Sequence, residues 1–312
     1  HQRRRYGLHV DVEAGVQVTF GATEAIAATM LGLLEPGDEV VVLEPFYDSY
    51  GAAIAMAGGT RRLVTLRPPD FALDLDALAS AARGARMLLL NSPHNPTGRV
   101  LSRTELELVA QACVDNDLIA VTDEVYEHLV FDGEHVPLAT LPGMADRTLT
   151  ISSAGKSFSF TGWKVGWASG PPALVGAVRA AKQFLTFAGA TPFQHAVAAG
   201  LADAERHVAP LRADLRAGRD RLCEGLRAAG LRVSVPQGGY FVNADVAPLG
   251  VADARDWCHA LPERAGIVAI PTSAFYEDRE AGRTLVRFAF CKRPEIIDEA
   301  VARLVTAAGS TV

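Results

Sequence analysis

The stretch MLLLNSPHNPTG, residues 87–98, joins a run of four apolar residues to a segment dense in turn formers. A short apolar run bounded by turn residues is typical of a strand that is buried on both faces. The turn formers place polar side chains at the carboxyl end of that strand, where open α/β sheets bind ligands. The stretch therefore predicts a buried parallel strand and one edge of a binding site.

The same pattern recurs along the first two thirds of the chain. Apolar or β-branched runs alternate with Ala-, Leu- and Glu-rich segments, which favours a mostly parallel sheet with helices on both faces. We therefore predict an α/β domain of about seven strands. The runs are residues 16–20, 40–43, 62–66, 87–90, 119–122, 149–152 and 165–168.

The pattern changes near residue 205. Residues 205–229 carry apolar side chains at helical spacing, with Gly230 as the expected C-cap, and Pro294 is expected to open a last helix. These features predict a large domain, residues 1–204, followed by a smaller α+β domain, residues 205–312. Strands of the smaller domain are expected at residues 231–235, 240–245, 267–270 and 285–290.

Composition excludes several classes of protein. The chain has 312 residues, 49% of them hydrophobic, and a net charge of -6, which is typical of a soluble globular protein. Such a charge gives no basic face for nucleic acid or an anionic membrane, and no apolar run reaches the ~20 residues that span a bilayer. The four cysteines show neither metal-ligand nor disulfide spacing, so we expect structural thiols, no metal site and a cytoplasmic protein.

The residues that follow three of the expected strands allow more than one interpretation. GATEA, residues 21–25, opens a helix whose backbone N–H groups would favour an anion, or it is only a connection. EPFYDSY, residues 44–50, brings aromatic side chains that cover a planar ligand or simply pack. In NSPHNPTG, Pro93 and Pro96 fix the backbone around Asn95, which is more than a turn needs.

Two further strand ends carry charged side chains. Asp123 directly follows an apolar run, where a carboxylate is costly unless it meets a cation or a donor, although a helix cap is the simpler interpretation. Tyr126 follows within one turn. Lys156 and Lys164 lie in SSAGKSFSFTGWKVGW, residues 152–167, and either one alone would be interpreted as a surface lysine.

Taken together, the strand ends offer a complementary set of groups. They supply an anion cradle, an aromatic cover, an amide, a phenol, a carboxylate and an amine nucleophile. A phosphate, a flat ring, a ring hydroxyl, a ring nitrogen and an aldehyde would use all of them. This inventory indicates pyridoxal phosphate.

The motifs GATEA, NSPHNPTG, TDEVYEHLVF and SSAGKSFSFTGWKVGW, in this order and with EPFYDSY and LVRFAFCKR, resemble the class I pyridoxal-phosphate aminotransferases of fold type I. The resemblance covers essentially the whole chain. It is closest to kynurenine, glutamine and methionine transaminases and to succinyldiaminopimelate aminotransferases. It implies transfer of an amino group from an amino acid to a 2-oxo acid. It also implies a homodimer in which residues 186–194 lie near the partner's site.

The resemblance assigns a role to each matching residue. Lys156 forms an aldimine with the cofactor and moves a proton as general base. Asp123 pairs with the pyridine nitrogen, Asn95 and Tyr126 hydrogen-bond the ring oxygen, and Tyr47 stacks on the ring. The substrate carboxylate is bound by Arg287, with Asn95 beside it. The phosphate is bound by Gly21, Ala22, Thr23, Ser153 and Lys164.

The substrate and the activity of this chain leave alternatives open. Aromatic residues suggest a partly apolar pocket and hence a neutral or aromatic amino donor, although each could belong to the core. Succinyldiaminopimelate, β-elimination on a cysteine conjugate, a regulatory ligand-binding module and a cofactor-free remnant are the alternatives. The aromatic residues are Phe46, Phe160, Phe187, Phe193, Tyr240 and Phe241.

The resemblance also indicates what precedes the chain in related proteins. Family members carry a further segment before the YGLHVD region, residues 6–11. That segment supplies part of the small domain, a glycine-containing loop at the substrate carboxylate and a tyrosine for the neighbouring subunit's phosphate. We therefore expect this chain to be an N-terminally truncated fragment.

Overall fold

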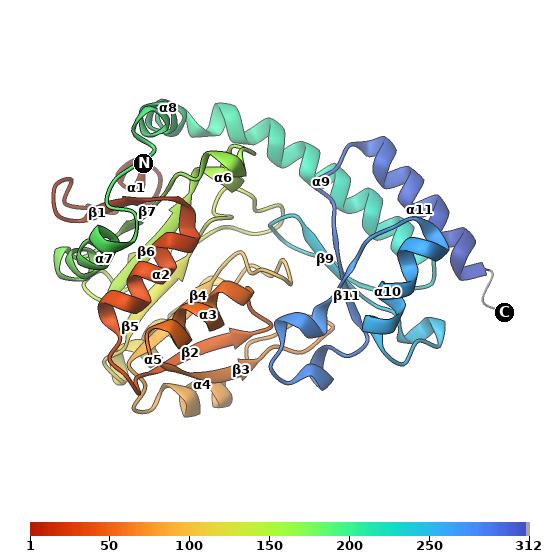
Figure 1. Ribbon diagram of the computed structural model, residues 1–312, viewed down its shortest axis with the longest axis horizontal. Helices are drawn as coiled ribbons and strands as arrows, with labels where there is room; N and C mark the ends of the chain where they lie inside the picture. The colour runs from red at the N-terminus through yellow and green to blue at the C-terminus, as the bar shows by residue number, and fades with distance from the viewer. Residues whose placement is uncertain (310–312) are drawn as a thin grey trace.

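A computed structural model describes residues 1–309, in which the larger of two sheets has seven strands (Figure 1). Their order is β1-β7-β6-β5-β4-β2-β3. Strands β2 to β6 run parallel, and β7 is antiparallel to both β6 and β1. Each strand lies within two residues of its expected ends, which confirms the predicted α/β sheet. The strands are β1 (Val16–Thr19), β2 (Glu39–Glu44), β3 (Thr60–Thr65), β4 (Met87–Asn91), β5 (Ile119–Asp123), β6 (Thr148–Ser153) and β7 (Gly166–Ser169).

Strand β4 is buried on both faces, as its apolar sequence predicts. Leu88 and Leu90 pack into one core with helices α4 (Leu75–Ala82) and α5 (Arg103–Asp115). Met87 and Leu89 point the other way, into a core formed with helices on the opposite face, because successive strand residues alternate sides. Those helices are α2 (Gly21–Leu33), α3 (Asp48–Met56) and α7 (Pro172–Leu185).

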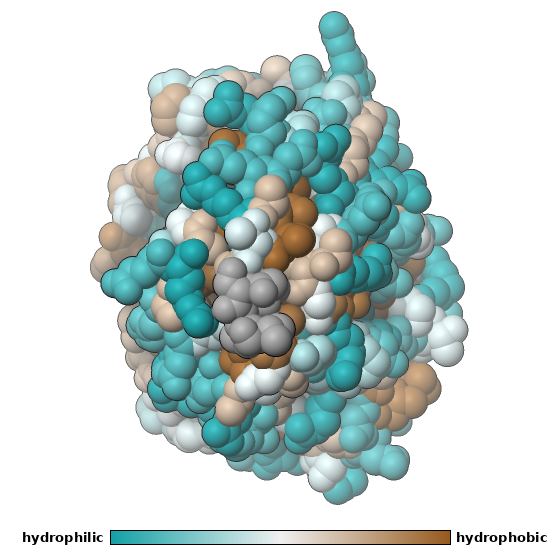
Figure 2. All heavy atoms as spheres, turned by 90° about the vertical axis from the view of Figure 1, so that its right-hand side faces the viewer, coloured by the Kyte–Doolittle hydropathy of each residue, from teal (hydrophilic) through white to brown (hydrophobic). Residues whose placement is uncertain are grey.

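The rest of the chain forms a smaller unit beside the first. After α8 (Thr191–Ala202), the long helix α9 (Ala204–Ala228) crosses from the first sheet to an antiparallel sheet of order β10-β11-β9-β8 (Figure 1). Figure 2 shows apolar side chains gathered between hydrophilic ones on the face that this unit presents. Its remaining elements are β8 (Arg232–Ser234), β9 (Phe241–Asp245), α10 (Ala254–Ala265), β10 (Ile270–Pro271), β11 (Leu285–Ala289) and α11 (Pro294–Gly309).

Two local expectations need correction. Helix α9 is capped by Ala229, and Gly230 follows the cap with a left-handed φ of 86°. The strand expected at residues 267–270 contains only Ile270 and Pro271. Proline has no N–H to donate to a sheet, so Pro271 ends the strand after two pairs with β11. Among the described residues, no helix combines the length and apolar character needed to cross a membrane.

Candidate active site

All eleven site residues expected from the sequence line one cavity of about 470 Å³. The cavity lies at the carboxyl ends of the strands of the larger sheet, as expected for an open α/β sheet. Arg287 reaches it from β11 of the second sheet. The structure therefore brings together Gly21, Ala22, Thr23, Tyr47, Asn95, Asp123, Tyr126, Ser153, Lys156, Lys164 and Arg287.

Asp123 is a buried carboxylate at the end of β5. Its side chain accepts a hydrogen bond from the Tyr50 hydroxyl at 2.6 Å and a longer one from the Val125 N–H at 3.3 Å. Burial raises the pKa of Asp123 to about 6, although the bond from Tyr50 and the charge of Lys156 oppose this effect. A cationic group in the cavity would therefore be strongly favoured beside Asp123.

Asn91, which was not expected to be a site residue, positions Asn95. The Asn91 side-chain amide donates to the Asp123 carbonyl oxygen at 2.7 Å, and its oxygen accepts from the Asn95 backbone N–H at 2.6 Å. These bonds fasten the NSPHNPTG loop to β5. The Asn95 side-chain oxygen in turn accepts a 3.0 Å bond from Arg287 Nη1, so the two strand ends and the second sheet meet at one place.

Arg287 is held between two aromatic rings. Its guanidinium carbon lies 4.0 Å from the centroid of Phe241 and 4.3 Å from that of Phe275. Two flanking rings fix the plane of a guanidinium, which then presents its N–H groups as a fork to a carboxylate. Phe275 was not expected from the sequence, because nothing in the segment TSAF, residues 272–275, marks it as a site residue.

Lys156 lies in the short helix α6 (Ala154–Ser157), directly after β6. Its Nζ is 5.4 Å from the ring centroid of Tyr240, and the Tyr240 ring meets Tyr126 edge-on at 5.3 Å. Burial raises the pKa of Tyr126 well above its usual value, and the neighbouring Tyr240 adds to this effect. The hydroxyl of Tyr126 therefore stays protonated at neutral pH and can donate a hydrogen bond.

Lys164 and the first turn of α2 form an anion-binding corner. Lys164 Nζ lies 3.6 Å from the position that a Cβ atom on Gly21 would occupy, so the ammonium lies beside the helix N-terminus. A helix N-terminus and an ammonium both attract an anion such as phosphate. Gly166, at the start of β7, lets that strand lie close to the first turn of α2, because a Cβ there would lie only 2.5 Å from the carbonyl carbon of Gly21.

The expected aromatic pocket is only partly present. Tyr240 and Phe241 line the cavity, but Phe46 is buried in the core beneath the sheet. The remaining three phenylalanines do not line it; Phe187, in the connection between α7 and α8, is 75% exposed. The apolar wall of the cavity instead consists of Tyr240, Phe241, Ile270, Ala274 and Phe275.

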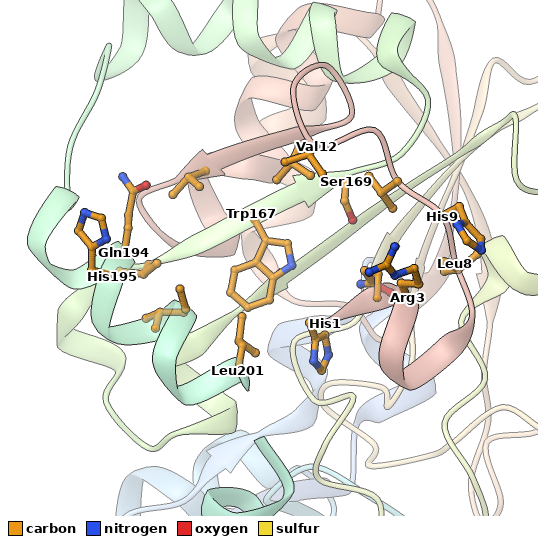
Figure 3. A pocket seen from close by; sticks show the side chains of 17 residues that line it. His1, Arg3, Leu8, His9, Val12, Trp167, Ser169, Gln194, His195 and Leu201 are labelled. Atoms are coloured by element: carbon orange, nitrogen blue, oxygen red, sulfur yellow. The ribbon is translucent and has the colours of Figure 1, made fainter. Parts of the chain in front are cut away.

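A larger cavity of about 650 Å³ lies elsewhere, beside β1, β7 and α8 (Figure 3). Its walls are mostly apolar, with Trp167 and Leu201 facing it and His1, Arg3 and His195 around it. The residues that line it include no carboxylate and no lysine. Of these two cavities, only the one of 470 Å³ combines an amine, a carboxylate and a guanidinium.

The comparisons with known proteins identify the family. Residues 1–304 match the family Aminotransferase class I and II. The chain is 54% identical to the probable N-succinyldiaminopimelate aminotransferase DapC of Mycobacterium tuberculosis, over 97% of this chain and 79% of that protein. It is 37% identical to kynurenine–oxoglutarate transaminase 3 of Mus musculus, over 95% of this chain and 71% of that protein.

Solved structures show the same fold. The N-succinyldiaminopimelate aminotransferase from Mycobacterium tuberculosis aligns with a TM-score of 0.95 at 54% identity, covering 98% of this chain and 81% of that one. The methionine aminotransferase YbdL from Escherichia coli aligns with a TM-score of 0.92 at 34% identity, covering 98% and 80%. These matches confirm fold type I.

The residues of the cavity fit pyridoxal phosphate, the cofactor of this family. The corner at Lys164 suits its phosphate, and the buried carboxylate of Asp123, whose hydrogen bonds come from an uncharged hydroxyl and a backbone N–H, suits a ring nitrogen that carries a proton. Lys156 supplies the amine for an aldehyde. The chain belongs to the class I and II aminotransferase family, and it is a pyridoxal-phosphate-dependent aminotransferase.

Proposed function

We propose that the cavity residues act in the roles expected from the sequence. Pyridoxal phosphate supplies an aldehyde and an electron-accepting ring. Asp123 holds a proton on the ring nitrogen, and Tyr126 donates to the ring oxygen with Asn95 beside it. The amine of Lys156 removes and returns the proton of the substrate α-carbon. Gly21, Ala22, Thr23, Ser153 and Lys164 bind the phosphate, and Tyr47 covers the ring.

One observation carries this assignment. An amine, a buried carboxylate and a guanidinium fixed between two rings come from three separate segments, yet all line a single cavity. Each has a distinct task in moving an amino group: Lys156 moves a proton, Asp123 stabilises a positive ring nitrogen, and Arg287 orients the carboxylate. A purely structural cluster would have no reason to leave the three charges facing a shared space.

N-succinyldiaminopimelate is our first candidate for the amino donor. The 54% identity to the Mycobacterium tuberculosis protein supports it. A neutral or aromatic amino acid is the second candidate, because Arg287 is the one arginine among the lining residues and the adjacent wall is apolar. The 37% identity to a kynurenine transaminase supports this second candidate.

A panel of half-reactions separates these candidates. Cofactor-loaded protein is mixed with N-succinyldiaminopimelate, kynurenine, methionine or glutamine, and the change in visible absorbance is followed without an acceptor. The preferred donor gives the highest second-order rate constant for the half-reaction. Release of pyruvate and ammonia from a cysteine conjugate would reveal β-elimination. Ligand binding without any conversion of the cofactor would indicate a regulatory module instead.

Replacing Arg287 by lysine is expected to raise KM for the amino donor by about 10- to 100-fold, with a smaller change in kcat. Lysine keeps the charge but loses the planar fork and the stacking on Phe241 and Phe275. Steady-state kinetics with the preferred donor measure the effect. The exposed Arg283, which pairs with Glu280, provides the matched control as Arg283→Lys. An unchanged KM in Arg287→Lys would remove Arg287 from the substrate site.

We further propose that the protein forms a homodimer, as the family resemblance implies. Phe184, near the end of α7, is 86% exposed, and Phe187, in the connection between α7 and α8, is 75% exposed. Phe193 of α8 is also exposed, and its ring stacks on the exposed Trp163, with the ring centroids 4.8 Å apart. Exposed aromatic side chains of this kind are typical of protein interfaces.

The substitution Phe187→Asp is expected to shift the protein from dimer to monomer, because a charge would be buried in the proposed interface. Light scattering at several protein concentrations measures the molar mass. Val268, which is 80% exposed on the smaller unit, provides the control variant Val268→Asp. If Phe187→Asp keeps the mass of the unmodified protein, the interface does not include this segment.

The domain limits and the location are also proposals. We assign residues 1–204 to a cofactor-binding domain and residues 205–312 to a small domain, since the second sheet is built entirely from segments after α9 begins. The four cysteines are all free, and three are buried, which supports a reducing cytoplasm. The net charge of -6 supports small molecules, and not nucleic acid or membrane, as partners.

A further inference from the structure

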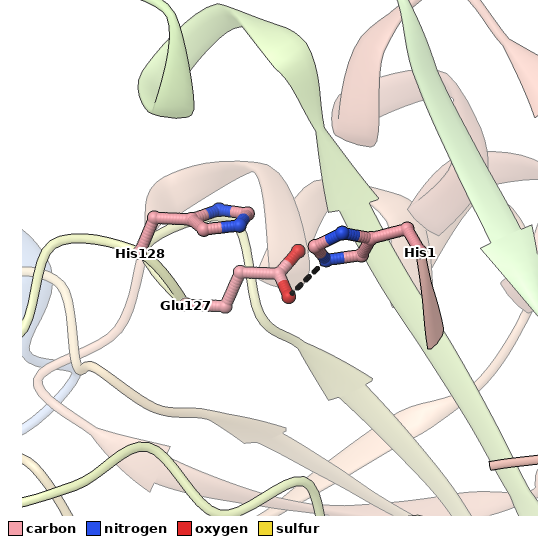
Figure 4. Close-up of side chains that lie close together, drawn as sticks. All are labelled: His1, Glu127 and His128. Atoms are coloured by element: carbon pink, nitrogen blue, oxygen red, sulfur yellow. Dashed lines mark hydrogen bonds and ion pairs between the residues drawn. The ribbon is translucent and has the colours of Figure 1, made fainter. Parts of the chain in front are cut away.

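A second cluster of ionisable side chains lies outside the active-site cavity. His1, at the start of α1 (Gln2–Tyr6), meets Glu127 and His128, which belong to the turn that follows β5 (Figure 4). None of the three lines the 470 Å³ cavity. We propose that His1, Glu127 and His128 form a binding site for a divalent transition metal ion such as Zn²⁺. This proposal does not depend on the proposed substrate or on the catalytic roles.

The three side chains offer a suitable set of ligand atoms. One atom from each residue lies within 4.8 Å of the other two, and the His1 Nε2 to Glu127 Oε2 distance is 3.1 Å. Ligands of a tetrahedral zinc ion at 2.0–2.2 Å are about 3.4 Å apart, so closure requires the imidazoles to turn inward by roughly 1 Å. Two imidazole nitrogens and one carboxylate oxygen are a common zinc ligand set.

One ligand atom has no partner at present. His128 is only 1% exposed, and its Nε2, which faces the carboxylate in Figure 4, has no hydrogen-bond partner among the described residues. An unpaired buried polar atom destabilises the folded state, because it has lost its hydrogen bonds to water. A metal ion accepts this lone pair and removes the cost, whereas the contact between His1 and Glu127 leaves it unsatisfied.

Neighbouring groups orient the ligands in the way that metal sites require. His128 Nδ1 lies 2.9 Å from Ser157 Oγ, which leaves Nε2 as the nitrogen available to a metal. Ser152 donates to Glu127 Oε1 at 2.7 Å, and Tyr6 donates to Oε2 at 2.6 Å. Two arginines carry positive charge near these ligands: Arg5 donates to the Tyr6 hydroxyl and to Glu205, and Arg212 donates to the His128 carbonyl oxygen at 3.4 Å.

Metal binding here would connect distant parts of the chain. His1 is separated from Glu127 by 126 positions, which explains why no metal-ligand spacing is visible in the sequence. Ser157, the partner of His128, directly follows Lys156. A bound ion would therefore fasten α1 to the turn that supports the helix of the catalytic lysine, and it would stabilise the folded state by mass action.

The test uses tag-free protein that has been loaded with pyridoxal phosphate, treated with a chelator and freed of both reagents. Calorimetric titration with zinc chloride is expected to show one ion per chain, with a micromolar or lower Kd. Cobalt chloride is expected to give the visible absorption of nitrogen and oxygen ligation, and saturating zinc is expected to raise Tm. The same Kd is expected before cofactor loading, because the site lies outside the cofactor cavity.

Three variants decide the outcome. His128→Gln and Glu127→Gln are expected to weaken zinc binding by tenfold or more. His1→Ala should do the same, and circular dichroism checks that this variant is folded. The exposed His9 provides the control, and His9→Gln should leave Kd unchanged. Absence of stoichiometric binding, equal Kd values in all variants, or binding that requires the cofactor would each overturn the proposal.

Discussion

Replacing Lys156 by alanine is expected to lower kcat/KM for transamination by about 10⁴-fold or more, because in the proposed roles its amine provides both covalent and proton-transfer chemistry. The second lysine of the cavity cannot take its place. Lys164 lies beside Gly21 at the start of α2, whereas Lys156 lies beside Tyr240 and Tyr126. Stopped-flow half-reactions with the preferred donor measure the loss directly.

The yellow absorbance that pyridoxal phosphate acquires on the protein provides a second readout for this variant. It should be absent from Lys156→Ala even with excess cofactor, while the circular dichroism spectrum stays unchanged. Lys292→Ala, which removes an exposed lysine on the smaller unit, is the control and should keep both colour and activity. A yellow, active Lys156→Ala protein would exclude the assignment of the nucleophile.

The substitution Asp123→Asn is expected to have two opposite effects. It should lower kcat by about 10²- to 10⁴-fold, since the amide no longer stabilises a proton on the ring nitrogen. It should also stabilise the cofactor-free protein by about 2 kcal/mol at pH 8, because the hydrogen bonds and the charge of Lys156 do not fully offset the cost of burying the carboxylate. Denaturant unfolding at a series of pH values measures the second effect.

The pH dependence of that second effect follows from the direction of the pKa shift. Burial raises the pKa of Asp123 to about 6, above its value in the unfolded chain, so the folded state binds the proton more tightly. The stability contributed by this group is present at low pH and is lost as pH rises through 6. The difference between Asp123→Asn and the unmodified protein should therefore vanish below about pH 4.

Tyr50→Phe provides the matched control, because it removes the 2.6 Å hydrogen bond to Asp123 but leaves the carboxylate in place. It should raise the pKa of Asp123 further and weaken cofactor binding, while the cofactor-free protein loses stability at pH 8. Equal stability of Asp123→Asn and the unmodified protein at every pH would contradict the inference that burial of the charged Asp123 carboxylate opposes folding.

The sequence predicts most of the larger sheet because its strands are buried on both faces. Runs such as MLLL, residues 87–90, leave little choice of structure, and the polar residues after each run must then meet at one edge. This reasoning located Asn95, Asp123 and Lys156 in one cavity. The small residues of GATEA, which open α2, suggested an anion site there, although a plain connection was the other interpretation.

Residues that position other site residues could not be predicted from the sequence. Tyr50 meets Asp123 across 73 positions, and only the packing of α3 on the sheet brings them together. Phe275 reaches Arg287 from a short 3₁₀ helix, Thr272–Phe275, whose composition carries no periodic pattern. Phe187 was wrongly placed in the pocket because an aromatic residue in a connection gives no indication of which way it points.

The sandwich of Arg287 between Phe241 and Phe275 has a consequence for how substrate preference can change. Arg287, the proposed partner of the amino-acid carboxylate, and the adjoining apolar wall belong to the second sheet and its loops. The cofactor's proposed partners, from Gly21 to Lys164, belong to the first sheet and its loops. Mutations at Ile270 or Ala274 can therefore reshape the space for a side chain while every proposed cofactor contact stays intact. This arrangement allows the preference for the amino donor to change during evolution while the cofactor-binding residues stay the same.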